Sequence, residues 1–440
     1  MRTIFMVFLL LIATFNIGQL EANVAKMVCF YDAASLAREG PAQLSMNDLE
    51  PALQFCNYLF YGYAGIDAET YQLQPLDPNL AIYRDHYRTI TALKRKHPQL
   101  RVLLSVGGDK DLQPDGEANK YLLLLEDVNR RQAFVNSANN VLRTYGFDGL
   151  DLAWQFPKNH PKIVKSGIKK AWSAFKGWFT GAKVVDEKAE EHKQQFTALV
   201  RELKSAFRQD AAMLTLTMLP NVNAELFIDA FTVVANLDFV NLATFDFKTP
   251  ERDPKLADYT APLYELYERS VEDNINYQVQ YWLNNTTPAN LINIGIAAYG
   301  RAWQMSKDSG ITGYPPIEET NGVAPAGRQT VTPGLLSWPE ICEKLRSPMN
   351  QDLTGADAPL RKVGDPTHRF GTYAYRAADE NGEHGLWVSY EDPISAATKA
   401  GYVHAKGLGG VAFFDLSLDD FRGKCADEKY PLLRSIKFKL

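Results

Sequence analysis

The stretch Phe147-Asp148-Gly149-Leu150-Asp151-Leu152-Ala153-Trp154-Gln155-Phe156-Pro157 is the most informative pattern in the chain. Apolar and polar residues alternate through it, which predicts a β-strand over Gly149–Ala153. The alternation places Asp151, Ala153 and Gln155 along one face of that strand. Because a charge inside a protein core is costly unless it is paired or hydrogen-bonded, acids on such a strand indicate function. In this strand the row of acids is interrupted at Ala153 and Gln155.

Seven further short apolar runs recur along the chain, separated mostly by helical stretches such as Asn129–Tyr145 and Ala189–Arg208. Alternating strands and helices imply a parallel sheet, and eight such units predict an α/β fold, a closed (β/α)8 TIM barrel. The long interval between strands 7 and 8 predicts a small inserted α+β domain, at roughly 300–386. The predicted strands are Met27–Tyr31, Phe55–Tyr61, Arg101–Val106, Gly149–Ala153, Met213–Met218, Phe239–Phe245, Leu291–Ala298 and Gly409–Phe414.

The carboxyl ends of the predicted strands are rich in aromatic and hydrogen-bonding side chains, which suits a sugar chain. For Trp154, packing in the core is favoured over a sugar platform. For Asp148 and Asp151, a structural role as buried, hydrogen-bonded acids is favoured over a role in the groove. The candidates for a glycan groove are Tyr61, Asp148, Asp151, Trp154, Asp246 and Phe414.

Residues 147–157 resemble the fourth-strand signature of the chitinases of glycoside hydrolase family 18, which reads Asp-Gly-x-Asp-x-Asp-Trp-Glu-Tyr-Pro. Four more segments resemble motifs of that family in the same order. The resemblance extends over nearly the whole mature chain, and it implies the same barrel with a domain inserted between strands 7 and 8. The four segments are Leu104–Gly108, Ala243–Asp246, Ile294–Arg301 and Gly407–Phe421.

The resemblance also implies a set of catalytic residues, and this chain departs from it at each position. In the family a glutamic acid protonates the leaving oxygen while the substrate's own N-acetyl oxygen attacks, an exception to the two-carboxylate scheme. That acid's position holds Gln155, and Ala153 replaces the aspartate that orients the acetamido group. Phe245 replaces a tyrosine that donates to the acetyl oxygen, and Phe414 replaces a tryptophan under the scissile sugar.

Loss of a general acid alone costs roughly 10²–10⁴-fold in rate. We therefore predict that the chain is not an enzyme and has no catalytic residue. Asp246 is the nearest substitute acid by family position, but nothing in the sequence aims it at a glycosidic oxygen.

The first residues read as a signal peptide over 1–22, which leaves 23–440 as the mature, secreted and extracellular chain. Arg2 supplies a positive charge, and Ile4–Phe15 is an apolar run. A retained membrane anchor is the alternative, but this run is shorter than the roughly 20 residues needed to span a bilayer. No other stretch is long and apolar enough to predict a span. A net charge of -5 argues against a nucleic-acid partner.

Secretion gives meaning to the four cysteines and to two glycosylation motifs. Four cysteines permit three pairings, of which Cys29 with Cys56 and Cys342 with Cys425 close the shorter loops. Free buried thiols are the alternative. No cysteine pair or histidine cluster has metal-ligand spacing, so we predict no metal and no cofactor. The overlapping acceptors Asn284 and Asn285 predict at most one N-linked glycan, with an unmodified polar turn as the alternative.

An extended segment over 158–192 follows the fourth strand. Between Lys158 and Val185 it contains seven lysines and no acid. Apolar residues spaced by 4, 3 and 4 predict a basic amphipathic helix that covers the groove or docks a partner. A helix packed on its own barrel is the alternative. The apolar residues are Ile168, Trp172, Phe175 and Phe179.

A long insert at this place together with Gln155 resembles the insect imaginal disc growth factors. That resemblance implies a secreted factor that acts with insulin-like peptides, and with a possible cell-surface receptor, on cell proliferation, polarisation and motility. The alternative function is a lectin-like matrix protein that binds chitin or another glycan, with chito-oligosaccharide as its ligand, and protects cuticle or aids wound repair. An active chitinase is disfavoured by Gln155 and Ala153.

Overall fold

The computed structural model describes residues 25–111, 119–158, 185–425 and 427–440. Eight parallel strands follow the order β1-β16-β9-β7-β6-β5-β4-β2, and pairing of β1 with β2 closes the ring. This closed barrel confirms the predicted fold class. Its strands are β1 (Lys26–Asp32), β2 (Tyr58–Ile66), β4 (Arg101–Gly107), β5 (Gly149–Ala153), β6 (Met213–Met218), β7 (Phe239–Leu242), β9 (Ile292–Ala297) and β16 (Gly410–Phe414).

The strand bounds agree with the periodicity of the sequence except at two strands. β2 covers Tyr58–Ile66 instead of the predicted Phe55–Tyr61, and β7 is shorter than predicted. That strand ends at Leu242, although the apolar run predicted it to continue to Phe245. Beyond Leu242 the chain leaves the ladder, and the Thr244 hydroxyl donates to the carbonyl oxygen of Gly295 at 3.0 Å. Residues 243–246 therefore form a loop at the barrel mouth.

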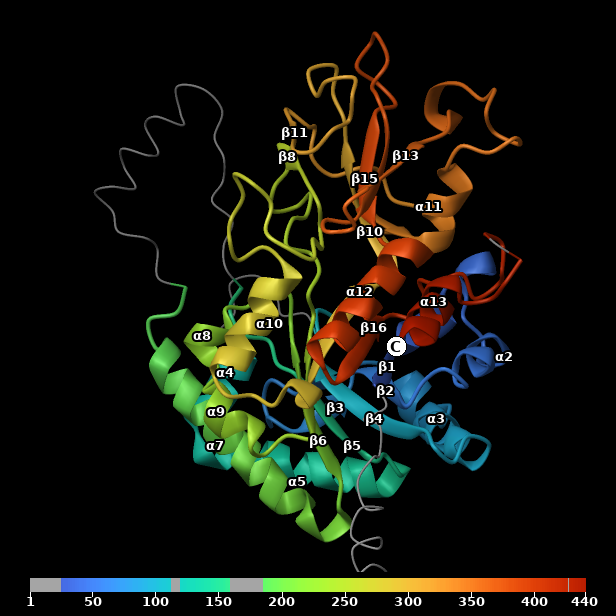
Figure 1. Cartoon of the computed structure of the whole chain (residues 1–440). Coiled ribbons are helices and arrows are strands. Elements are labelled where there is room, and N and C mark those ends of the chain that lie inside the picture. The colour runs from blue at the N-terminus through green and yellow to red at the C-terminus, as the bar shows by residue number, and fades with distance from the viewer. Residues whose placement is uncertain (1–24, 112–118, 159–184, 426) are drawn as a thin grey trace, which may run out of the picture.

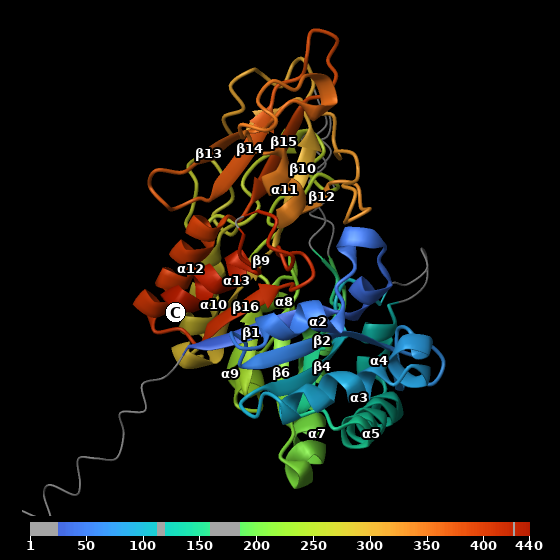
Figure 2. The ribbon, with the colours of Figure 1, turned by 90° about the vertical axis from the view of Figure 1, so that its right-hand side faces the viewer.

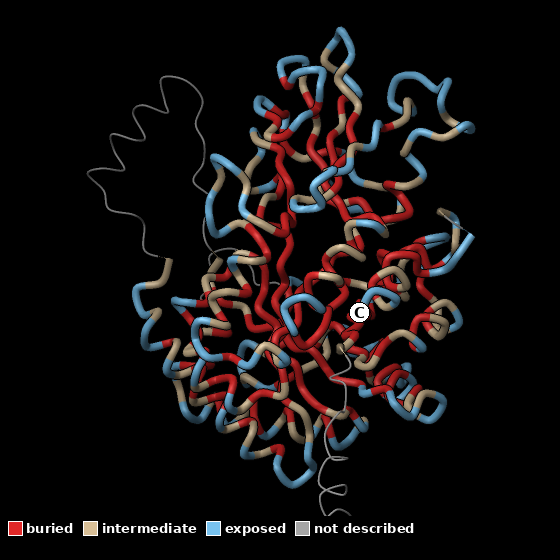
Figure 3. The backbone as a smooth tube through the Cα atoms, in the orientation of Figure 1, coloured by how far each residue is buried: buried red, intermediate tan, exposed pale blue. Residues whose placement is uncertain are grey.

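Helices surround the barrel (Figure 1). Helix α5 begins after Asp127, which accepts from two backbone N–H groups, and ends at Gly146, whose φ of 74° suits a left-handed cap. The backbone tube shows the strands buried along their length (Figure 3). The helices around the barrel are α2 (Met46–Leu49), α3 (His86–Thr91), α4 (Lys120–Glu126), α5 (Val128–Tyr145), α7 (Ala189–Phe207), α8 (Ala224–Phe227), α9 (Ala230–Val234), α10 (Ile275–Asn284), α12 (Pro393–Lys406) and α13 (Pro431–Lys439).

Residues 299–390, between β9 and α12, form a second lobe above the barrel (Figures 1 and 2). Its antiparallel sheet has the order β12-β10-β15-β14-β13 and packs around a ring pair, Trp303 and Trp387, with centroids 5.6 Å apart. The predicted insertion therefore holds an α+β lobe whose sheet spans residues 299–390. Its elements are β10 (Tyr299–Gln304), β11 (Ile317–Glu318), β12 (Leu335–Ser337), α11 (Trp338–Lys344), β13 (Arg361–Gly364), β14 (Thr372–Arg376) and β15 (Leu386–Tyr390); two short strands, β3 (Leu73–Pro75) and β8 (Leu256–Ala257), pair with β2 and β11.

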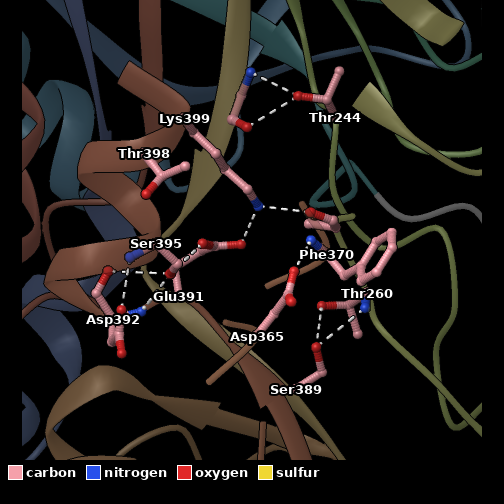
Figure 4. Close-up of polar contacts among 12 residues, drawn as sticks. Thr244, Thr260, Asp365, Phe370, Ser389, Glu391, Asp392, Ser395, Thr398 and Lys399 are labelled. Atoms are coloured by element: carbon pink, nitrogen blue, oxygen red, sulfur yellow. Dashed lines mark hydrogen bonds and ion pairs between the residues drawn. The ribbon is translucent and has the colours of Figure 1, made fainter. Parts of the chain in front are cut away.

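A buried ion pair joins this lobe to the barrel layer (Figure 4). The Lys399 ammonium of α12 contacts the carboxylate of Glu391, which directly follows β15. It also donates to the carbonyl oxygen of Ala261 at 2.6 Å, while the Ser395 hydroxyl donates to Glu391 at 2.7 Å. The Lys399 and Glu391 side chains are only 3% and 5% exposed. The pair thus connects the end of β15 and helix α12, which follow one another in the chain, to Ala261, which lies 138 residues before Lys399.

Two disulfides stabilise the two lobes, and both predicted pairs are confirmed. Cys29 of β1 is bonded to Cys56, just before β2, with Cα atoms 5.9 Å apart. Cys342 of α11 is bonded to Cys425, after β16, with a Cα separation of 6.0 Å. Both separations are ordinary for disulfides. The second bond ties the inserted lobe to the C-terminal segment.

Two sequence predictions concern residues that lie wholly or partly outside the described ranges. The signal peptide over 1–22 lies outside the described residues, as do 159–184 of the extended segment over 158–192. Residues 189–192 of that segment are the first turn of α7. Within the described residues, no helix has the length and apolar character needed to cross a membrane.

Candidate functional site

A buried carboxylate lies inside the barrel. Asp151 of β5 is fully buried and accepts hydrogen bonds from Ser105 of β4, at 2.7 Å, and from Thr215 and Thr217 of β6, at 2.7 and 2.9 Å. The Asn241 amide donates in turn to the Thr217 hydroxyl at 3.1 Å. Burial raises the pKa of Asp151 to about 6, against the lowering effect of these three hydroxyls. The barrel's own side chains thus occupy both oxygens of this acid.

The amide of Gln155 is held by backbone carbonyl groups of the loop after β4. Its Nε2 donates to the oxygen of Gly108 at 2.5 Å and to the oxygen of Asp111 at 3.0 Å. Carbonyl oxygens only accept hydrogen bonds, so this position requires a donor. A carboxylate has no proton to offer there. Ala153, two residues earlier, is fully buried and brings no polar group to the site.

Aromatic rings surround the barrel mouth beside these residues. Phe414 at the end of β16 stacks on Phe30 with centroids 4.0 Å apart, and the Phe245 ring lies 5.0 Å from Phe414. Tyr299 meets Phe245 edge to face at 5.9 Å. Phe414 and Phe245 are 9% and 5% exposed. Because Phe245 has no hydroxyl, it offers a ring face but no hydrogen-bond donor.

Asp246 follows Phe245 and is closed off by an ion pair. The Arg301 guanidinium binds both carboxylate oxygens, at 2.9 and 2.6 Å, and the Tyr299 hydroxyl donates to the carboxylate at 2.9 Å. Burial opposes ionisation, but the Arg301 charge prevails and lowers the pKa of Asp246 below its usual range. An acid that stays ionised is a poor proton donor, so the geometry does not favour Asp246 as a general acid.

The sequence matches the family described as Glycosyl hydrolases family 18 over residues 26–419. The chain belongs to glycosyl hydrolase family 18. Over 424 residues it is 59% identical to Chitinase-like protein Idgf5 of Drosophila melanogaster, covering 95% of this chain and 94% of that protein. Imaginal disk growth factor 6 of the same organism is 55% identical over 97% of this chain and 95% of its own length.

Among solved structures, human YKL-39 is similar with a TM-score of 0.70 and 26% identity, over 94% of this chain and 99% of that one. YKL-39 is described as a pseudo-chitinase with retained chitooligosaccharide binding properties. These similarities place the chain in a chitinase-like growth factor branch of family 18, and the names of its relatives suggest inactivity.

Two of the groove candidates in this family 18 barrel point away from its interior. This agrees with the favoured core-packing reading of Trp154 and corrects the assignment of Tyr61. The Trp154 ring is 1% exposed and packs against Tyr121 and Phe134 at 5.0 and 5.8 Å, between β5 and the outer helices. Tyr61 packs against Tyr87 of α3 at 5.0 Å. Both alternate with inward residues of their strands, so they face the helical layer.

Asp148 lies at the opposite end of the barrel from the mouth. It precedes β5, accepts from the Val102 backbone N–H at 2.7 Å and pairs with Lys94 at 3.1 Å. Ala153 is five positions further along the chain, about 17 Å away. Asp148 therefore lies at the closed end of the barrel, in agreement with the favoured structural reading of this acid, and it is not placed to line a glycan groove.

The structure brings in residues that the sequence analysis did not select. Arg301 and Tyr299 of β10 bind the carboxylate of Asp246. Both residues stand at the end of the seventh-strand motif, and that position could have identified them as site residues. Thr215 and Thr217 alternate along β6, a period-2 pattern that puts two hydroxyls on one face. Their meeting with Asp151 required the register of β5 on β6.

One group of three acidic and histidine side chains lies close enough to share an ion within the part of the chain that the structure describes. It consists of Asp379, Glu383 and His384, and all three are exposed. No buried donor accompanies them, so we assign them no metal.

Proposed function

We propose that this chain is a secreted chitinase-like growth factor that does not hydrolyse chitin and cooperates with insulin-like peptides in cell proliferation, polarisation and motility. The observation that carries the loss of hydrolysis is the Gln155 amide, which donates to two backbone carbonyl oxygens. The similarity of the chain to Imaginal disk growth factor 6 supports the growth-factor role. The partners under this proposal are a cell-surface receptor and an insulin-like peptide.

A cell assay tests this proposal. Purified mature protein, added to cultured insect imaginal disc cells with a limiting amount of insulin, is expected to raise cell number several-fold over insulin alone. Removal of residues 161–184, the core of the basic segment, is expected to abolish the stimulation while far-ultraviolet circular dichroism stays unchanged. Wild-type protein without effect on cell number would contradict the growth-factor role, and full activity of the deletion would contradict the role of the segment.

A second candidate function, glycan binding, is favoured by the aromatic rings at the mouth. Phe414 and Phe245 are aromatic residues of the kind on which sugars stack, although each ring is largely covered by its aromatic neighbours. A solved relative, YKL-39, is described as retaining chitooligosaccharide binding. Such binding is compatible with signalling, because a groove that does not cleave its ligand can hold it.

Calorimetry with chitohexaose tests the second candidate. We expect measurable binding to the wild type and a loss of about 3- to 10-fold in affinity for Phe414→Ala, since an aromatic contact contributes about 0.5–1.5 kcal/mol. Trp154→Phe is the matched control, because Trp154 lies behind the barrel wall, and its affinity is expected to stay within twofold. Absence of heat with the wild type would remove glycan binding as a function.

A further inference from the structure

Two overlapping acceptor motifs for N-linked glycans lie at the end of α10. Asn284 is the last residue of the helix and Asn285 is its C-terminal cap. The motif of Asn284 uses the hydroxyl of Thr286, and the motif of Asn285 uses that of Thr287. Both asparagines are exposed, so exposure of the acceptor alone does not choose between them.

The surroundings of the two motifs differ sharply. Thr286 is exposed, whereas Thr287 is 4% exposed and its hydroxyl is buried. The Asn285 amide is engaged, because its Nδ2 donates to the carbonyl oxygen of Tyr281 at 2.8 Å. Pro288 also directly follows the second motif. In the Asn284 motif, both the asparagine and the threonine are exposed. In the Asn285 motif, the asparagine amide is hydrogen-bonded and the threonine hydroxyl is buried.

A groove bordered by Asn284 and Asn285 lies between the helices on the outside of the barrel. It has a volume of about 740 Å³ and lies among α7, α8, α9 and α10, which share one flank in Figure 1. Tyr277, Gln280 and Tyr281 line it from α10, at seven, four and three residues before Asn284. Residues with these spacings share a helix face, so the root of a glycan on Asn284 lies beside the groove.

The groove lining suits a sugar. Tyr277 is 42% exposed and offers part of its ring, while side chains of α7 and α8 such as Gln194, Arg201 and Glu225 offer donors and acceptors. Sugars combine apolar faces with hydroxyl groups, so rings and polar groups together are the complementary surface. A sugar attached at the rim also reaches the groove without the entropic cost of a free ligand.

We propose that Asn284, and not Asn285, carries an N-linked glycan, and that its first N-acetylglucosamine units lie in this groove. The inference rests on the proposed secretion, since the modification takes place in the secretory pathway. It gives the groove an occupant that belongs to this chain, so the surface between α7 and α10 is covered in the secreted protein.

Glycopeptide mass spectrometry of protein secreted from insect cells tests the choice of site. The overlap provides two separating variants: Thr286→Ala removes the Asn284 motif and keeps that of Asn285, while Asn285→Gln does the reverse. We expect one glycan on the wild type and on Asn285→Gln, and none on Thr286→Ala. A glycan on Thr286→Ala, or secreted wild type without a glycan at Asn284, would overturn this inference alone. Protein retained in the cell and unmodified would overturn the proposed secretion as well.

Hydrogen exchange before and after enzymatic removal of the glycan tests its place. We expect amide exchange in peptides covering 190–201 and 275–285 to rise at least twofold on removal, with no change in a distant peptide covering 386–406. Equal exchange in both forms would show that the sugar projects into solvent, and it would refute the seating in the groove.

Discussion

Gln155→Glu is expected to remain inactive and to unfold more easily than the wild type. The substitution restores the side chain that the family signature carries, but it places a carboxylate oxygen against the carbonyl oxygens of Gly108 and Asp111, where Nε2 now donates. An unmatched buried polar group costs about 1–3 kcal/mol, and Gln155 is half-buried, so we expect a loss of about 1–2 kcal/mol at pH 7. Ala153 and Phe245 still lack the groups that position the substrate. We expect hydrolysis to stay roughly 10⁴-fold below that of an active chitinase.

Urea denaturation and a fluorogenic chito-oligosaccharide measure the two effects. Gln155→Met is the control, because it removes the donor without adding a charge, and its loss of stability is expected to be smaller. Repulsion from two carbonyl groups also raises the pKa of the new glutamate in the folded state. Gln155→Glu should therefore lose less unfolding free energy relative to Gln155→Met as the pH falls through the pKa of that glutamate in the folded protein. The protonated acid can again donate a hydrogen bond to a carbonyl oxygen. Gln155→Glu as stable as the wild type at pH 7 would contradict this account of the loop.

Lys399→Met is expected to destabilise the protein by about 3–5 kcal/mol, because it leaves the Glu391 carboxylate buried without its counter-ion. The effect should concentrate where the inserted lobe joins α12, since Lys399 also holds the Ala261 carbonyl group (Figure 4). Urea denaturation followed by tryptophan fluorescence measures the loss.

Two further variants separate the charge from the side chain's bulk. Lys96→Met removes a lysine that also pairs with a glutamate, Glu50, at 3.0 Å, but both side chains are exposed, so it should cost at most about 1 kcal/mol. Adding Glu391→Gln to Lys399→Met should recover part of the loss, because no unpaired charge remains. Equal losses for Lys399→Met and Lys96→Met would refute the importance of the buried pair.

The barrel was predictable because its strands differ from the helices between them in period and residue type. Residues 149–153 and 213–218 appeared in the sequence with the bounds that the structure has. Alternation also placed Asp151 on an inward face. It did not show which partners would take up its oxygens, since Thr215 and Thr217 reach it only through the register of β5 on β6.

The site was less predictable, because a position in a motif does not give a direction in space. Trp154 belongs to the fourth-strand signature and Tyr61 lies on β2, yet both rings face the helices, since neighbours along a strand point to opposite sides. Asp148 shares the signature but stands at the other end of the strand. The ion pair of Asp246 with Arg301 joins two segments 55 residues apart, and no local pattern predicts such a contact.

Release of fluorophore from a chito-oligosaccharide by the wild-type protein tests the central claim most directly. We predict release no faster than in a protein-free control. The Gln155 amide donates hydrogen bonds but cannot transfer a proton to a leaving group, and Arg301 keeps Asp246 ionised. Turnover within a hundredfold of an active family 18 chitinase, measured alongside it, would contradict the account.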